Sequence, residues 1–174
     1  SLSGMMAHNY YLYESQGKLN ILPWDYNLSL GGMGDMGDAS SVINDAIYDS
    51  FSSTDFFDPL LEDETYLAQY HAYLSQLVEA YINGGGFEEF YNRVRGQLDP
   101  LVEKDPTAFY SYEEYQQAAD MLYQVVLLRG QSIEGQLNGT IPSTSEGQRG
   151  TDALIQADGL DISAMGTMDM GGMF

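Results

Sequence analysis

The amino-acid sequence predicts an α+β fold in which one β-hairpin precedes a bundle of helices. Two observations predict it: a pair of strand-like segments near the N-terminus, and three long segments with helical spacing of apolar residues in the middle of the chain. The 174 residues are about the length of one domain, and 44% are apolar and 13% aromatic, which is enough to build a core. We therefore expect a folded chain.

The hairpin is predicted between residues 8 and 25. Residues 8–13 (HNYYLY) are rich in aromatic strand formers, residues 15–17 supply a turn with a glycine, and residues 19–22 (LNIL) alternate apolar and polar side chains. A loop is expected next, because residues 31–37 contain four glycines. A short helix over residues 41–51 and a loop over residues 52–59 follow.

Three longer helices are predicted from apolar residues that recur at steps of three and four. The first covers residues 66–82 and ends at a run of glycines, and the second covers residues 87–102 and ends before an Asp-Pro pair. The third covers residues 111–137. Ser111 and Glu114 have the spacing of a capping box at its start, and Gly139 closes it.

The chain is predicted to divide after Gly139. Residues 140–174 are dominated by Ser, Thr, Gly and Gln, and the last ten residues hold four of the nine methionines. Apolar islands such as residues 153–155 are too small to hold a fold of their own. We expect residues 1–139 to form the folded unit and residues 140–174 to be a Gly/Ser/Met-rich linker or tail, largely disordered.

Charge and composition exclude several functions. The chain has 26 acidic and 6 basic residues, a net charge of −20, which disfavours nucleic acid and anionic membranes as partners and leaves cations and basic proteins. It has no cysteine, so thiolate zinc sites, catalytic thiols and disulfides are absent. No apolar run is long enough to span a bilayer, and residues 1–8 do not read as a signal peptide. Because the chain begins at Ser1 and soon enters a strand, we expect it to be the C-terminal part of a longer protein.

Asn9 and Asp25 are the candidate metal ligands, because they flank the predicted hairpin. A hairpin returns the chain beside itself, so the amide oxygen of Asn9 and the carboxylate of Asp25 can converge. Mg²⁺ takes one or two such protein ligands and completes its octahedron with phosphates and waters. Asn27 lies two residues further on and is a candidate for a third oxygen. Asn and Asp at strand ends are also common as turn residues that make local hydrogen bonds.

An EF-hand is an alternative cation site that the sequence excludes. Asp25, Asn27 and Ser29 match its first three ligand positions. Leu30 then occupies the position that requires glycine, and Met36 occupies the position that requires glutamate.

The hairpin carries a specific resemblance. Residues 8–14 (HNYYLYE), 17–19 (GKL) and 21–28 (ILPWDYNL, with Leu22 before the proline) resemble the signature of the CotH family, bacterial spore-coat and cell-surface proteins with an atypical protein-kinase fold. Residues 70–74, 102–107 and 135–144 are similar to clostridial members too, so the resemblance spans about residues 5–148. It implies that the hairpin and helices correspond to the C-terminal lobe of an atypical protein kinase.

The resemblance also implies roles for the hairpin residues. In protein kinases a catalytic Asp precedes an Asn, and the Asp of the DFG motif follows; the Asn and the DFG Asp hold the Mg²⁺ ions that bridge the nucleotide phosphates. Asn9 resembles that Asn and Asp25 resembles the DFG Asp, which implies ATP and Mg²⁺ as cofactors. The full-length protein would transfer the ATP γ-phosphate to serines of coat or surface proteins, at the spore coat or cell surface.

Other kinase parts are not found in this sequence. The family's catalytic Asp is expected upstream of Ser1, and residues 1–7 contain no carboxylate, so no catalytic residue is assigned here. The N-terminal lobe, which brings the Gly-rich loop and the nucleotide-binding Lys, is missing as well. We expect the isolated chain to be inactive. The alternative is a non-catalytic structural or interaction module whose acidic surface recruits basic partners. An intact upstream lobe in the parent protein would favour the enzyme.

Overall fold

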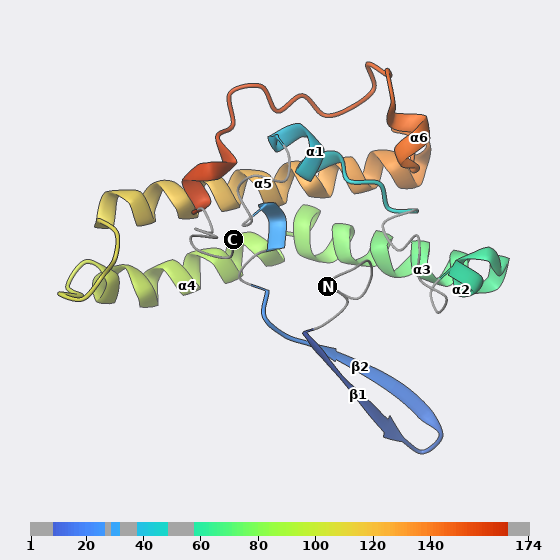
Figure 1. Ribbon diagram of the computed structural model, residues 1–174, viewed down its shortest axis with the longest axis horizontal. Helices are drawn as coiled ribbons and strands as arrows, with labels where there is room; N and C mark the ends of the chain where they lie inside the picture. Colours follow the sequence, from blue (N-terminus) through green and yellow to red (C-terminus); the bar gives the residue numbers. More distant parts are fainter. Residues whose placement is uncertain (1–8, 27–28, 32–37, 49–57, 167–174) are drawn as a thin grey trace, which may run out of the picture.

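The computed structural model describes residues 9–26, 29–31, 38–48 and 58–166 (Figure 1). It confirms the α+β class. β1 (Tyr10–Ser15) and β2 (Lys18–Pro23) form an antiparallel hairpin, with Tyr10 opposite Pro23 and Ser15 opposite Lys18. The rest of the described chain is mostly helical, and the hairpin extends away from the helices.

The remaining elements follow in chain order: η1 (Ser29–Gly31), α1 (Ala39–Asn44), α2 (Asp58–Glu62), α3 (Glu64–Leu77), the π-helix η2 (Val78–Asn83), α4 (Gly86–Val102), α5 (Tyr112–Asn138), α6 (Ser145–Gln148) and η3 (Ile162–Met165).

The three long helices are confirmed, and their ends have the expected chemistry. The capping box at the start of α5 is complete. The hydroxyl of Ser111 accepts a hydrogen bond from the backbone N–H of Glu114, and the carboxylate of Glu114 accepts one from the backbone N–H of Ser111. Gly139 ends α5 with a φ of 80°, in the left-handed region that favours glycine. The first predicted helix is divided, since its last turn is the π-helix η2.

The shorter predictions around residues 38–62 need correction. The expected helix over residues 41–51 begins earlier, at Ala39, because Asp38 caps it, and ends at Asn44. Residues 49–57 lie outside the described residues. The loop predicted over residues 52–59 ends earlier than expected, because α2 begins at Asp58.

The core lies where α5, α1 and the C-terminal residues meet. Its buried members are Ala39, Ile43, Val125, Ala157 and Ile162. Residues 140–166, which we call the C-terminal strap, run back along α5 and pass over α1 (Figure 1).

The expectation of disorder is therefore wrong for the strap. Ile141, Ala157 and Ile162 are buried, each at most 6% exposed. Single apolar residues spaced along the strap are enough to order it, because each one packs on α5 or α1 and no separate core is needed. The division of the chain after Gly139 stays a prediction.

A buried polar network fastens the segment after α1 to α5. Gln136 accepts a hydrogen bond from the backbone N–H of Ile47 (2.9 Å) and donates to the carbonyl of Asp45 (3.2 Å). The guanidinium of Arg129 donates to the carbonyls of Ile43 and Asp45. Backbone groups that would be costly to bury unpaired are thus satisfied by side chains of one helix.

Aromatic and charged side chains join α4 to α5. Tyr91 and Tyr123 lie with their ring centroids 4.8 Å apart. Beside them Arg95 pairs with Asp99 at 2.7 Å, and the hydroxyl of Tyr115 donates to the same carboxylate at 2.9 Å. This cluster sets how the two helices lie against each other.

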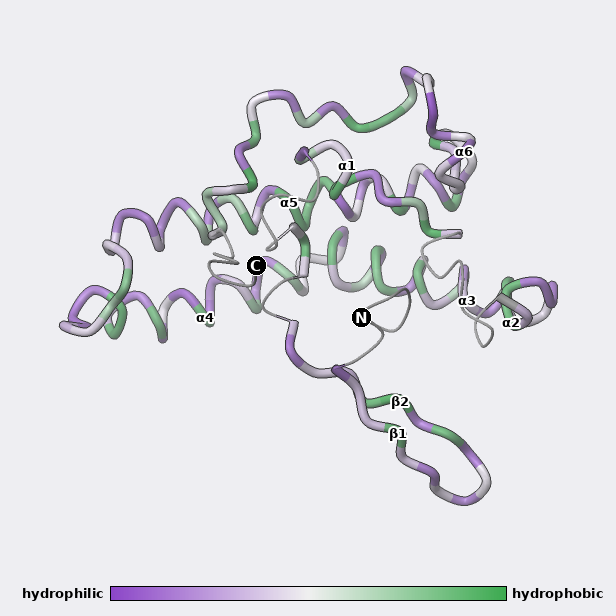
Figure 2. The backbone as a smooth tube through the Cα atoms, in the orientation of Figure 1, coloured by the Kyte–Doolittle hydropathy of each residue, from purple (hydrophilic) through white to green (hydrophobic). Residues whose placement is uncertain are grey.

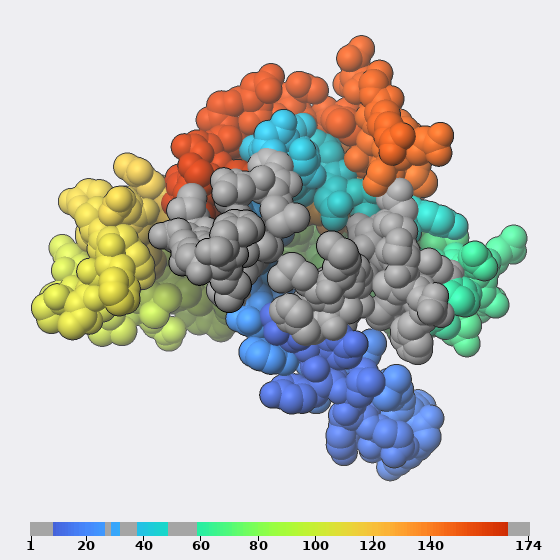
Figure 3. Space-filling view, in the orientation of Figure 1, coloured from blue at the N-terminus to red at the C-terminus, as the bar shows by residue number. Residues whose placement is uncertain are grey.

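The hairpin is apolar yet exposed. Figure 2 shows hydrophobic positions along its strands, and Figure 3 shows it protruding from the body. Tyr11, Leu12, Leu19 and Leu22 are all more than half exposed. An isolated two-stranded hairpin is marginally stable in water, so these side chains form a surface suited to contact with more protein.

Candidate functional site

The open end of the hairpin brings Asn9 and Asp25 together. The backbone N–H of Trp24 donates to the carbonyl of Asn9 at 2.9 Å, which extends the strand pairing by one step beyond Tyr10 and Pro23. The side-chain Nδ2 of Asn9 then donates to Oδ2 of Asp25 at 3.0 Å. The structure thus brings the two flanking residues together, with the amide nitrogen of Asn9, and not the expected amide oxygen, directed at the carboxylate of Asp25.

Both residues have an unusual backbone conformation. The φ angle is 68° at Asn9 and 64° at Asp25, in the left-handed region. Asn and Asp adopt this region more readily than other residues with a Cβ, yet it still costs free energy, of the order of 1 kcal/mol each. Paired positions of this kind are found at sites where the direction of a side chain matters.

The two remaining oxygens are of the kind that a hard cation prefers. Because Nδ2 of Asn9 is used in the bond to Asp25, the amide oxygen of Asn9 remains as an acceptor, and so does Oδ1 of Asp25. Within the described residues neither oxygen accepts another hydrogen bond. Asp25 is exposed and Asn9 is half-buried. Amide and carboxylate oxygens are the protein ligands that Mg²⁺ takes when phosphates and water complete its coordination, and a role of these two oxygens as ligands stays a prediction.

No richer metal centre competes with this pair in the described part of the chain. There, no group of three or more histidine and acidic side chains is arranged to hold a metal ion. Asn27, the third candidate ligand, lies outside the described residues.

Lys18 and Asp38, two further polar residues, have structural roles. Lys18 lies beside the turn of the hairpin, opposite Ser15 and at the other end of β2 from Asp25. Asp38 caps α1, because its carboxylate accepts hydrogen bonds from the backbone N–H and the hydroxyl of Ser41, both at 2.8 Å. These bonds lower the pKa of Asp38 below its ordinary value.

An aromatic pair lies next to the candidate ligands. Tyr11 and Trp24 stack with ring centroids 6.1 Å apart. Trp24 directly precedes Asp25 and remains 48% exposed. The candidate site is therefore bordered by an apolar surface that is open in this chain.

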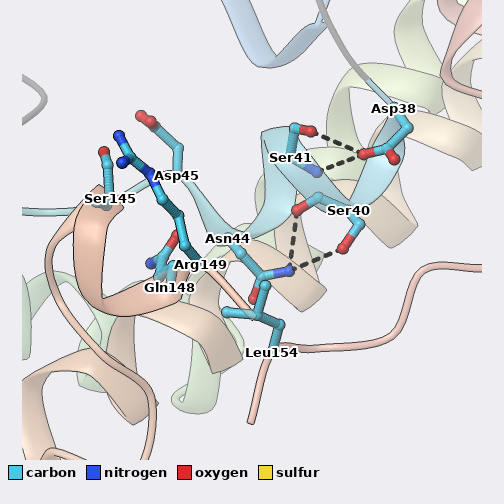
Figure 4. A pocket seen from close by; sticks show the side chains of 10 residues that line it. Asp38, Ser40, Ser41, Asn44, Asp45, Ser145, Gln148, Arg149 and Leu154 are labelled. Carbon is cyan, nitrogen blue, oxygen red and sulfur yellow. Dashed lines mark hydrogen bonds between the residues drawn. The ribbon is translucent and has the colours of Figure 1, made fainter. Parts of the chain in front are cut away.

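A separate hollow of about 450 Å³ lies between α1, α6 and the strap (Figure 4). No hairpin residue lines it. Its polar groups are largely used internally, because Asp38 caps α1 and Asn44 bonds to the backbone of Ser40 and Ile155. The pair Asn9–Asp25 remains the better candidate for chemistry.

Sequence reasoning missed the buried network on α5. Arg129, Ser132 and Gln136 interrupt the apolar stripe of that helix at steps of three and four, which places them on its inner face. Polar residues at such positions must find partners when buried, and that signal was available. Arg129 and Gln136 bond to backbone groups 86 to 91 residues away, and Ser132 donates to the side chain of Asn44, 88 residues away; periodicity cannot identify such partners.

Comparison with known proteins identifies the family. No helix of the described residues has the length and apolar character needed to cross a membrane. No significant match was found among curated proteins or among solved structures. The model of the family described as CotH kinase protein matches residues 4–133, which include the hairpin, the Asn9–Asp25 pair and most of the helical body. This match covers well over half of the 174 residues, and the chain therefore belongs to the CotH kinase protein family.

Proposed function

We propose that this chain is the C-terminal part of an atypical protein kinase that transfers the γ-phosphate of ATP to serines. The observation that carries the proposal is the contact between Asn9 and Asp25 at the base of the hairpin. It joins the two residue types that kinases use to hold Mg²⁺, in the same chain order. The family match supports ATP as the nucleotide.

In this proposal Asn9 and Asp25 hold Mg²⁺ through the amide oxygen and a carboxylate oxygen. Bound Mg²⁺ supplies charge neutralisation and orientation of the nucleotide phosphates. The hydrogen bond between the two side chains fixes their relative direction before the nucleotide arrives. A preset geometry of this kind lowers the cost of reaching the transition state. Asn27 is the candidate for an additional oxygen.

The remaining parts of the machinery are proposed to come from upstream residues. The Asp that orients the serine hydroxyl and the lobe that covers the nucleotide are both expected there. The exposed apolar side chains of the hairpin, among them Leu12 and Trp24, are suited to pack against that lobe. The chain by itself is proposed to be inactive.

Substrates are proposed to be serine-containing coat or surface proteins, and the location is proposed to be the spore coat or cell surface. The net charge of −20 favours basic substrates, because it attracts them and repels acidic ones.

A phosphorylation assay tests the proposal. The chain extended upstream by the expected lobe is incubated with labelled ATP, Mg²⁺ and a serine-rich basic protein, and the unextended chain serves as the comparison. We expect label in the protein for the extended form and none for the unextended form. A folded extended form that transfers no label would favour the non-catalytic alternative, a structural or interaction module. Label transferred by the unextended chain would overturn its proposed inactivity.

A further inference from the structure

The C-terminal strap, which lies beyond the family-matched residues, reaches the segment that follows Asp25. At Gly31 a Cβ would lie 3.2 Å from Cδ1 of Ile162 in the strap and 3.2 Å from Cγ2 of Val42. The φ angle of Gly31 is 91°, which also favours glycine. The backbone of η1 is therefore in close contact with a strap side chain.

The same contact is part of the core. Ile162 is 6% exposed and belongs to the buried cluster around Val125 of α5. Leu30, the central residue of η1, packs against this cluster. Core packing of this density fixes the position of η1, since small displacements would open a cavity.

Only a short link separates this anchored point from Asp25. The backbone N–H of Ser29, the first residue of η1, donates to the carbonyl of Tyr26, the residue after Asp25, at 2.9 Å. Asp25 and Leu30 have φ angles of 64° and 55°. Residues other than glycine keep a left-handed conformation only where the surroundings hold them. The exposed hairpin supplies little packing for this, whereas the strap supplies a buried contact.

The strap is itself held firmly. Asn44 donates to the carbonyl of Ile155 at 2.9 Å and accepts from the N–H of Ile155 at 3.0 Å. Asn44 is 2% exposed, and its backbone carbonyl accepts a hydrogen bond from the side-chain amide of Gln136 on α5. Buried paired hydrogen bonds of this kind fix the register of the strap on the helix body.

We propose that the C-terminal strap positions Asp25, with Ile162 as the positioning residue. The strap presses on η1, and η1 sets the direction in which the backbone leaves the hairpin. The consequence for Mg²⁺ rests on the function proposed above, whereas the effect on the backbone does not.

Two matched substitutions test the proposal. Ile162→Val removes the Cδ1 atom that contacts Gly31. Ile141→Val removes the equivalent atom from another buried strap residue, which packs on Gly135 instead. Hydrogen exchange measured by mass spectrometry on the present chain should be about three- to tenfold faster over residues 24–31 in Ile162→Val, and unchanged there in Ile141→Val. Equal exchange of this segment in the two variants would overturn the proposal.

A second measurement separates this proposal from the proposed function. In the chain extended upstream, Mg²⁺-dependent ATP affinity should fall about three- to tenfold in Ile162→Val and stay constant in Ile141→Val, although both lower the melting temperature. Equal affinities in the two variants would contradict positioning by Ile162. If the unsubstituted extended protein binds no ATP, the proposed function fails, and the exchange experiment still decides the role of the strap.

Discussion

The side chain of Asn9 donates a hydrogen bond to the carboxylate of Asp25 at 3.0 Å across 16 positions of sequence. The hairpin between them makes this contact possible, because its strands pair from Tyr10 to Pro23 and return the chain to its starting point. Each residue is also held in a left-handed conformation. The local structure thus presents an amide and a carboxylate together at one solvent-facing point.

Substitutions at Asn9 separate its side chain from its backbone. Asn9→Gly removes the amide and tolerates the φ of 68°, whereas Asn9→Ala removes the amide and adds about 1 kcal/mol of backbone strain. We expect both to weaken Mg²⁺-dependent ATP binding in the extended protein, and only the alanine variant to lower the melting temperature. Unchanged binding in the glycine variant would show that the amide is not a ligand.

Two helical glycines are predicted to respond in opposite directions to alanine. A Cβ on Gly130 of α5 would lie 2.8 Å from Cγ2 of Ile82, whereas a Cβ on Gly96 of α4 would meet nothing within 4 Å. In urea denaturation, Gly130→Ala should lower the free energy of unfolding by about 1–3 kcal/mol through overpacking, and Gly96→Ala should raise it by about 0.5–1 kcal/mol.

The double substitution Gly130→Ala with Ile82→Ala provides the control, because it removes Cγ1 and Cγ2 of Ile82, the two atoms closest to the added Cβ. Its cost should be smaller than the sum of the two single costs. Additive costs would mean that α5 and η2 are not in close contact at this point.

The buried network on α5 is predicted to matter for stability. Gln136→Leu leaves the N–H of Ile47 without its partner in a buried position, so the free energy of unfolding should fall by about 2–3 kcal/mol. Gln117→Leu, on the exposed face of the same helix, should change it by less than about 0.5 kcal/mol. Urea denaturation measures both, and equal effects would contradict the assigned role of Gln136.

Alkaline pH is predicted to destabilise the contact between α4 and α5. Burial, together with the hydrogen bond to Asp99, raises the pKa of the Tyr115 hydroxyl to about 12 from an ordinary value near 10. Between these values the folded chain holds the proton and the unfolded chain releases it, so stability is complete below about pH 10 and declines as pH approaches 12. Tyr115→Phe should reduce this decline in urea unfolding across that range. Identical slopes for the two proteins would contradict the prediction.

Much of the fold could be predicted because its signals are local. The capping box at Ser111, the glycine at position 139 and the convergence of Asn9 with Asp25 all depend on short-range geometry. The order of the strap could not be predicted, because Ile162 is stabilised by α5 and η1 and not by its neighbours in sequence. For the same reason the partners of Gln136 became visible only in the folded chain.

Calorimetry of ATP binding to the chain extended upstream, with and without Mg²⁺, tests directly whether Asp25 holds Mg²⁺ at a nucleotide site. Asp25→Asn is the informative variant, because asparagine tolerates the φ of 64° while the carboxylate is lost. Asp158→Asn, at an exposed position of the strap, is the matched control. We expect ATP binding that requires Mg²⁺, is lost in Asp25→Asn and is retained in Asp158→Asn. Mg²⁺-dependent binding that survives in Asp25→Asn, or no binding by a folded protein, would contradict it.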